Sequence, residues 1–272
     1  MVPYSQDQVN GFDETLIADM LDLIALGPSM ILLDAMAGDG NLSLRIFQYC
    51  ERKALPLPSI TLLESSPEQC DLACEKLSRY PTLKIVCGDV LKMEAHDGSE
   101  TLFPKTFDRV AIKSGNHEIP KARQPLLYQK IHDVLKPGGL FINLGALFEE
   151  EEERDEFHAI IRAKDRLASL HHLVENRYPL IRKELYAYLD KAGFCSVRCG
   201  KHFEYVHRSD RFAEQYFPEE NRAELELEFQ QQQIRARCLR LREKIIFQGL
   251  ISIMTAPGEI TVAQRGDTCA GK

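Results

Sequence analysis

The fold is decided by the stretch Met30-Ile31-Leu32-Leu33-Asp34-Ala35-Met36-Ala37-Gly38-Asp39-Gly40-Asn41. It begins with an apolar run that has no polar residue before Asp34, which is typical of a strand buried on both faces of a parallel sheet. Two glycines then bracket Asp39, and helical spacing resumes from Asn41 onward. The stretch therefore predicts a strand, a tight turn and a helix. In open α/β sheets the first such turn binds a nucleotide-like ligand.

The spacing of the glycines distinguishes this turn from other nucleotide-binding loops. The dinucleotide fingerprint has a third glycine three residues after the second, whereas this chain has Ser43. A nicotinamide-dependent oxidoreductase is disfavoured for that reason, and no Gly-Lys-Ser/Thr of a phosphate-binding loop follows. The remaining pattern, Asp-x-x-x-Gly-x-Gly, resembles motif I of the class I S-adenosylmethionine-dependent methyltransferases. That family often has a further glycine where this chain has Met36.

Three later features occur in the order that the resemblance implies. A second apolar strand over residues 59–63 ends in Glu64, and a third over residues 83–87 is followed by Gly88-Asp89. Residues 135–139 read Leu-Lys-Pro-Gly-Gly and precede an apolar fifth strand. The resemblance covers residues 30–147. It implies a Rossmann-like α/β fold with a seven-stranded, mostly parallel sheet in the order 3-2-1-4-5-7-6, whose last strand is antiparallel.

The resemblance also implies that S-adenosyl-L-methionine binds at the carboxyl edge of the sheet. Asp34 would orient the backbone beside the methionine part of the cofactor. Glu64 would accept hydrogen bonds from both ribose hydroxyls, and Asp89 with Val90 would hold the adenine. Asp39 is equally well interpreted as a loop acid that faces solvent. The residues expected to contact the cofactor are Asp34, Ala35, Gly38, Asp39, Gly40, Glu64, Ser65, Gly88, Asp89, Val90, Lys113 and Ser114.

A polar cluster at the end of the predicted fourth strand supplies the candidate catalytic residues. Methyl transfer from a sulfonium is an in-line displacement, so the protein mainly aligns the reactants and excludes water. A general base is needed where the nucleophile must lose a proton. His117, with Glu118 beside it, has the chemistry for that task, because imidazole titrates near neutral pH. The alternative is a loop histidine that packs or forms hydrogen bonds locally.

Composition narrows the classes of partner. The chain has 34 basic and 41 acidic side chains, a net charge of −7, which argues against broad binding to nucleic acid or to an anionic membrane. The amino-terminal residues show no signal-peptide pattern, and no apolar run approaches the ~20 residues of a membrane span. The eight cysteines are scattered without Cys-x-x-Cys spacing, which predicts reduced thiols, a cytoplasmic protein and no metal site.

We predict one domain over residues 1–272, with its core at about residues 28–148. A single helix is expected over 149–174, opening with five glutamates, and a long helix over 219–247. These helices belong to two inserted segments, at about 149–176 and 209–248, which we interpret as a lid over the strand ends. A strand over 194–206 and a last strand over 251–263, turned at Ala256-Pro257-Gly258, complete the sheet.

The sequence therefore favours a methyltransferase that acts on a small molecule. The fourth-strand cluster lacks the Asn/Asp-Pro-Pro-Tyr/Phe pattern of many enzymes that methylate exocyclic base or amide nitrogens, and the acceptor atom stays undetermined. A protein methyltransferase is one alternative. Another is a non-catalytic relative that serves as a partner or scaffold module. The predicted long helix has apolar residues at near-heptad spacing, which could form a homodimer or partner surface.

Overall fold

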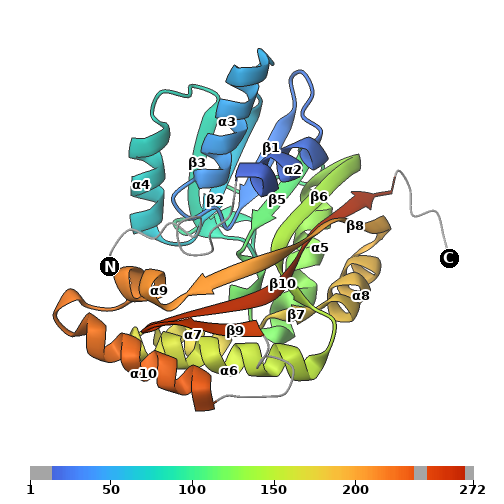
Figure 1. Cartoon of the computed structure of the whole chain (residues 1–272). Helices are drawn as coiled ribbons and strands as arrows, with labels where there is room; N and C mark the ends of the chain where they lie inside the picture. The colour runs from blue at the N-terminus through green and yellow to red at the C-terminus, as the bar shows by residue number, and fades with distance from the viewer. Residues whose placement is uncertain (1–13, 236–243, 267–272) are drawn as a thin grey trace.

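The computed structural model describes residues 14–235 and 244–266, and within them one ten-stranded sheet runs through the molecule (Figure 1). Five strands form its parallel half, in the spatial order β3-β2-β1-β5-β6. The bounds of these strands are β1 Ile31–Ala35, β2 Ser59–Glu64, β3 Leu83–Asp89, β5 Phe107–Lys113 and β6 Leu135–Phe148. In register, Leu33 of β1 lies between Thr61 of β2 and Val110 of β5. The ends of β1 and β5 are therefore neighbours at one edge of the sheet.

The antiparallel half completes the sheet. Strand β10 (Ile251–Arg265) lies between β6 and β8 (Phe194–Arg208) and is antiparallel to both. If the seven principal strands are numbered along the chain, their order is 3-2-1-4-5-7-6, so the predicted topology is confirmed. Three short strands raise the total to ten: β4 (Glu94–Ala95), β7 (Leu180–Ile181) and β9 (Ile245–Gln248).

Helices cover both faces of the sheet. Leu32 packs in a core cluster with side chains of α2 (Glu14–Ile24), α3 (Asn41–Lys53) and α4 (Pro67–Leu77). The next residue, Leu33, packs in a second cluster with side chains of α5 (Gln124–Val134) and α8 (Arg182–Ala192). Successive strand residues point to opposite faces, so an unbroken apolar run is what a doubly covered strand requires.

Four further helices gather beyond one end of the sheet, in the lower part of Figure 1. They are α6 (Glu151–Leu167), α7 (His171–Asn176), α9 (Ser209–Tyr216) and α10 (Arg222–Arg235). Helix α10 packs against both α6 and α9. Short 3-10 turns η1 (Asn116–Glu118), η2 (Lys121–Arg123) and η3 (Glu219–Asn221) complete the described elements. Within the described residues, no helix combines the length and apolar character that a membrane crossing needs.

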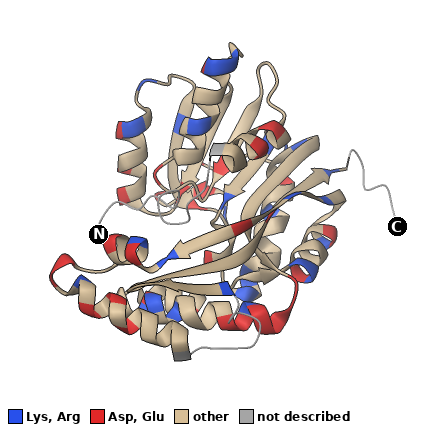
Figure 2. Cartoon of the chain, in the orientation of Figure 1, with Lys and Arg blue, Asp and Glu red and all other residues tan. Residues whose placement is uncertain are grey.

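The charges of helix α6 follow its dipole. Glu151, Glu152 and Glu153 occupy its first turn, where Figure 2 shows a dense acidic segment. Lys164 and Arg166 lie in its last turn. Acidic groups at the amino end and basic groups at the carboxyl end are both stabilised by the macrodipole. The glutamate run is therefore a helix start, as its position in the sequence predicted.

The prediction of a single helix over 149–174 is wrong. Helix α6 ends at Leu167, and α7 starts at His171. Between them Ser169 has a left-handed backbone, with φ of +58°, and the Leu170 N–H donates to the Asp165 carbonyl at 2.8 Å. Because the apolar spacing continues across this turn, periodicity alone did not reveal the break.

The long helix predicted over 219–247 is also wrong at both ends. Residues 219–221 form η3, and α10 is described as far as Arg235. Residues 236–243 lie outside the described part of the chain. Ile245–Gln248 forms β9 and pairs with the start of β10 across Gly249, whose φ is +62°. A run of three apolar residues fits a helix or a strand equally well, and pairing with β10 favours the strand.

The turn predicted at Ala256-Pro257-Gly258 does not exist, because β10 continues through it. On one side Pro257 pairs with Glu204 of β8. On the other side β9 pairs with residues 251–254 and β6 with residues 258–264, so Pro257 falls in the gap between two partners. A proline has no N–H to donate and is tolerated where a strand lacks a neighbour.

Candidate active site

The turn after β1 places three residues in the left-handed backbone region. Their φ angles are +57° at Met36, +56° at Gly38 and +77° at Gly40. A Cβ on Gly40 would lie 2.6 Å from Leu77 Cδ1, so this glycine is required for the turn to pack against α4. Met36 stands where the resembling family often has glycine, and it adopts the backbone that favours glycine. Met36 is therefore accommodated in the turn with a left-handed backbone.

Asp34, near the end of β1, stabilises this turn. Its side chain is buried, and Oδ2 accepts hydrogen bonds from the Ser43 N–H at 3.1 Å and the Ser43 hydroxyl at 2.7 Å. Burial raises the pKa of Asp34 to about 7, against the lowering effect of these bonds and of the Lys113 charge. Ser43 was noted in the sequence only as a missing glycine. In the structure it joins the first turn of α3 to the end of β1.

Glu64 at the end of β2 reaches the same turn. Its Oε2 accepts from the Gly38 N–H at 2.8 Å, and its Oε1 accepts from the Ser66 N–H at 2.9 Å and the Ser65 hydroxyl at 3.3 Å. At the end of β3, Asp89 Oδ1 accepts from the Leu91 N–H at 2.8 Å. The acidic residues predicted for the cofactor therefore lie at the ends of adjacent strands.

Two contacts beside the glycine turn bear on the remaining predicted residues. Asp39 forms an ion pair with Lys76 of α4, which also donates to Asn41 Oδ1 at 3.0 Å, so this acid is held toward the helix. Gln69 Oε1 is buried without a hydrogen-bond partner among the described residues. Among the described residues, it is the one atom that lies within 4 Å of a Cβ built on Gly38, at 3.9 Å. An unsatisfied acceptor beside an open glycine is a place where a ligand donor fits.

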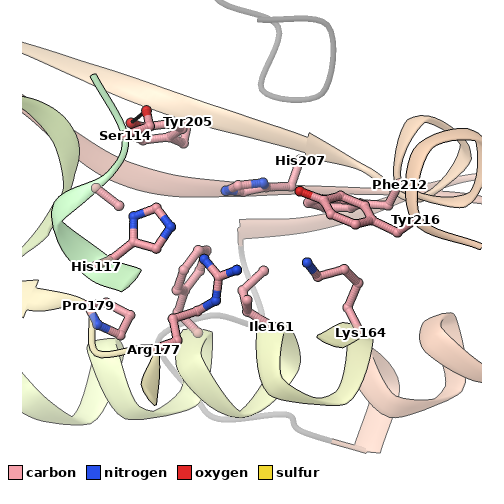
Figure 3. A pocket seen from close by; sticks show the side chains of 12 residues that line it. Ser114, His117, Ile161, Lys164, Arg177, Pro179, Tyr205, His207, Phe212 and Tyr216 are labelled. Carbon is pink, nitrogen blue, oxygen red and sulfur yellow. Dashed lines mark hydrogen bonds between the residues drawn. The ribbon is translucent and has the colours of Figure 1, made fainter. Parts of the chain in front are cut away.

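A pocket of about 50 Å³ lies beyond the end of β5 and is bordered by α6 and α9 (Figure 3). Its walls combine aromatic, aliphatic and basic side chains. They are Ser114, His117, Ala146, Phe157, Ile161, Lys164, Arg177, Pro179, Tyr205, His207, Phe212 and Tyr216. Of the residues predicted as site residues, Ser114 and His117 line this pocket, whereas Glu118 does not. The hydroxyls of Ser114 and Tyr205, two residues of the pocket wall, share a hydrogen bond of 2.7 Å.

His117 is held in place by its backbone. Gln124 Nε2 donates to the Asn116 carbonyl at 2.6 Å, and the Tyr178 N–H donates to the His117 carbonyl at 2.7 Å. Burial, with the nearby charges of Arg177 and Lys164, lowers the pKa of His117 well below 6.5. The imidazole is therefore neutral at neutral pH, and in this environment it is a weaker base than a free imidazole. Burial raises the pKa of the neighbouring Glu118 carboxyl.

The comparisons with known proteins agree with this geometry. Residues 32–139 match the family model described as a methyltransferase domain. The chain therefore contains a methyltransferase domain over these residues. The family expected from the sequence is thereby confirmed, and enzymes of this class use S-adenosylmethionine as their cofactor.

The relatives of the methyltransferase domain are distant. A carboxy-S-adenosyl-L-methionine synthase of Shewanella piezotolerans is 29% identical over 129 residues. That match covers 46% of this chain and about half of the relative, 48% of its length. The YcgJ protein of Bacillus subtilis superposes with a TM-score of 0.73 at 12% identity, covering 93% of this chain and 98% of its own. A phosphoethanolamine N-methyltransferase of Haemonchus contortus, solved with S-adenosylmethionine, superposes with a TM-score of 0.57 at 14% identity. That match covers 93% of this chain and 53% of the other. The fold is shared with both structures.

A separate group of polar side chains lies on the antiparallel half of the sheet, outside the methyltransferase motifs. Among the described residues, Cys199, His202 and Glu259 place donor atoms within 4.8 Å of one another. The Glu259 carboxylate already accepts from Arg182 Nε at 2.8 Å and from the Tyr186 hydroxyl at 3.0 Å. A guanidinium at this distance disfavours a second cation, so the group is better described as a buried ion pair.

Proposed function

We propose that this chain transfers a methyl group from S-adenosylmethionine to a small-molecule acceptor. The observation that carries the proposal is the position of the pocket. Ser114 and His117 line it just beyond the end of β5, the strand that lies next to β1 and its glycine turn. A cofactor on the turn and an acceptor in the pocket would therefore be neighbours at the same edge of the sheet.

The residues at the strand ends fit the cofactor. Bound there, S-adenosylmethionine supplies a methyl group on a positively charged sulfur, ready for displacement. Glu64 would accept from the ribose hydroxyls and Asp89 from the adenine amine, while the open backbone at Gly38 allows close approach. The unsatisfied Gln69 Oε1 offers one more acceptor beside Gly38. The name of the Shewanella relative places S-adenosylmethionine chemistry in that protein, which supports the same cofactor here.

The pocket fits a small acceptor. Phe157, Phe212 and Tyr216 give it aromatic walls, which would keep water away from an in-line displacement. His117 would accept a proton from an acceptor hydroxyl or protonated nitrogen, a role that its neutral state allows. Helices α6 and α9 form part of the walls, and this supports the interpretation of the inserted segments as a lid.

A labelling experiment tests the proposal. The purified chain is incubated with S-adenosylmethionine that carries a deuterated methyl group, together with a small-molecule cell extract, and products are followed by mass spectrometry. We expect the label in a small molecule, and less of it with His117→Ala. Label in protein would favour a protein methyltransferase. A folded chain that transfers no label and binds no S-adenosylmethionine would favour the scaffold alternative.

A further inference from the structure

Two cations line the pocket from the side of α6 and α7. Lys164 lies in the last turn of α6 with 1% of its surface exposed, and Arg177, which follows α7, has 9% exposed. Figure 3 shows both side chains on one side of the pocket, opposite His207. Burying an ionised side chain is costly unless an opposite charge or a ligand compensates it. The charges that surround this pair therefore decide what the pocket binds.

One buried carboxylate serves both cations. Asp165 is fully buried, with Oδ1 at 2.5 Å from Lys164 Nζ, and its Oδ2 accepts from Arg177 Nε at 2.9 Å. The ring of Tyr216 also lies 3.7 Å from Lys164 Nζ and contributes a cation–π contact. Lys164, Arg177 and Asp165 together therefore carry a net positive charge beside the pocket.

The histidines around the pair add no further positive charge at pH 7. Burial lowers the pKa of His158 to about 4 and that of His207 to about 3, so both rings are neutral at pH 7. His117 is neutral for the same reason. Burial raises the pKa of Glu118, which moves this carboxyl toward its uncharged form.

His207 gives an independent indication of a ligand. The residue is 94% buried, as only 6% of its surface is exposed, and it lines the pocket. Neither ring nitrogen has a hydrogen-bond partner among the described residues. The ring is stacked between Tyr205 and Phe212, with centroids 5.8 Å and 5.4 Å away, so its orientation is fixed by packing. Buried polar groups are rarely left unpaired, and a neutral imidazole supplies one donor.

We propose that the acceptor is a small carboxylate, whose anionic group lies between Lys164 and Arg177 and accepts a hydrogen bond from His207. This inference rests on the proposed function and names the chemical class of its substrate. Asp165 already offsets part of the positive charge of the two cations, so a monoanionic carboxylate matches the pocket better than a dianionic phosphate ester. The apolar walls, Phe157 and Ile161 among them, would hold the body of the molecule. The methyl-accepting atom would then lie toward His117 and Ser114.

The size of the pocket agrees with such a group. A cavity needs roughly 10–15 Å³ to hold one water molecule, so about 50 Å³ accommodates a few heavy atoms. That space accommodates a carboxylate together with part of the small molecule that carries it.

Ligand binding tests the proposal without knowledge of the natural acceptor. Propanoate and benzoate are each compared with their uncharged amides, by ligand-observed NMR in the presence of S-adenosylhomocysteine. We expect the parent chain to bind each carboxylate at least about tenfold more tightly than its amide, since charge-assisted hydrogen bonds are lost with the amide. Lys164→Met should remove this preference. Lys84→Met should keep it, because Lys84 is an exposed residue of β3 paired with Glu100.

The outcomes separate this inference from the proposed function. A parent chain that binds acid and amide equally, or neither, would overturn the carboxylate assignment, and this measurement needs no variant. A folded Lys164→Met chain that keeps the preference would overturn it as well. Calorimetric titration with S-adenosylmethionine is made on the same proteins. If Lys164→Met weakens that binding, the cations hold the carboxylate of the cofactor itself. If the parent fails to bind the cofactor, the proposed function fails.

Discussion

The carboxylate of Asp34 accepts two hydrogen bonds from Ser43, at 3.1 Å from the backbone nitrogen and 2.7 Å from the hydroxyl. Helix α3 begins after Gly40, which has no side chain with which to cap the helix. Asp34 supplies the missing acceptor from the preceding strand, where the helix dipole also favours an acid. Asp34 therefore contributes to the site by fixing the turn between β1 and α3.

Loss of the Ser43 hydroxyl should destabilise the fold. Ser43→Ala leaves the buried Asp34 carboxylate with one hydrogen bond fewer, and we expect the free energy of unfolding to fall by about 1–3 kcal/mol. Urea denaturation measures this change. Ser78→Ala at the exposed end of α4 is the control and should stay within about 0.5 kcal/mol of the parent. Equal effects of the two substitutions would remove the structural role of the Asp34–Ser43 contact.

The two glycines of the turn should respond differently to alanine. Both have positive φ, so each substitution costs roughly 1–2 kcal/mol of backbone strain. In Gly40→Ala the new Cβ also meets Leu77 at 2.6 Å and Leu62 at 3.0 Å, which adds about 1–3 kcal/mol of overpacking. Around Gly38 the space is open. Gly40→Ala should therefore unfold at a lower temperature than Gly38→Ala. The reverse order of the two unfolding temperatures would contradict the packing described for the turn.

His207 should make the protein less stable in acid. Its pKa is about 3 in the folded chain, below the ordinary 6.5, so between these values the unfolded chain binds more protons. Stability contributed by neutral His207 is present above about pH 6.5 and is lost as pH falls toward 3, by at most ~1.4 kcal/mol per pH unit. His207→Phe should therefore lose less stability than the parent between these pH values.

Asp34 has the opposite effect on the pH dependence of stability, because its pKa is raised in the folded chain. Both proteins contain Asp34, so its contribution cancels when their stabilities are compared. Denaturation curves of parent and His207→Phe at a series of pH values give the difference. Parallel pH profiles would show that His207 is as easily protonated in the folded chain as in the unfolded one.

His117→Ala should reduce turnover by about 10²–10⁴-fold if the acceptor must lose a proton, with cofactor affinity nearly unchanged. The imidazole lines the pocket at the end of β5, whereas Asp34, Glu64 and Asp89 lie at the ends of β1, β2 and β3. His171→Ala, on the exposed face of α7, is the matched control. Turnover like that of the parent from about pH 6 to about pH 9 would leave His117 as a packing residue.

The residues of the motif predicted β1, the turn and α3 closely, because apolar periodicity and glycine positions are local properties. The prediction of the strand order had a different basis. It followed from resemblance to a family, since no local pattern states which strands are neighbours. The acids at the ends of β1, β2 and β3 were found because each directly follows an apolar run.

The basic side of the pocket was not predicted. Lys164 occupies an amphipathic helix, where a lysine usually faces solvent, and Arg177 and His207 come from segments distant in sequence. Their proximity depends on the turn at Ser169 and on the pairing of β8 with β10. Both are tertiary features. The sequence shows such residues only as single charges with no common pattern.

Calorimetric titration of the purified chain with S-adenosylmethionine tests the central claim most directly. The account predicts one binding site per chain. Glu64→Ala should weaken this binding by about 1–3 kcal/mol while the chain stays folded, because charge-assisted hydrogen bonds to the ribose are lost. A Glu64→Ala chain that binds like the parent would remove this acid from the site. A folded parent chain that binds no S-adenosylmethionine would contradict the account as a whole.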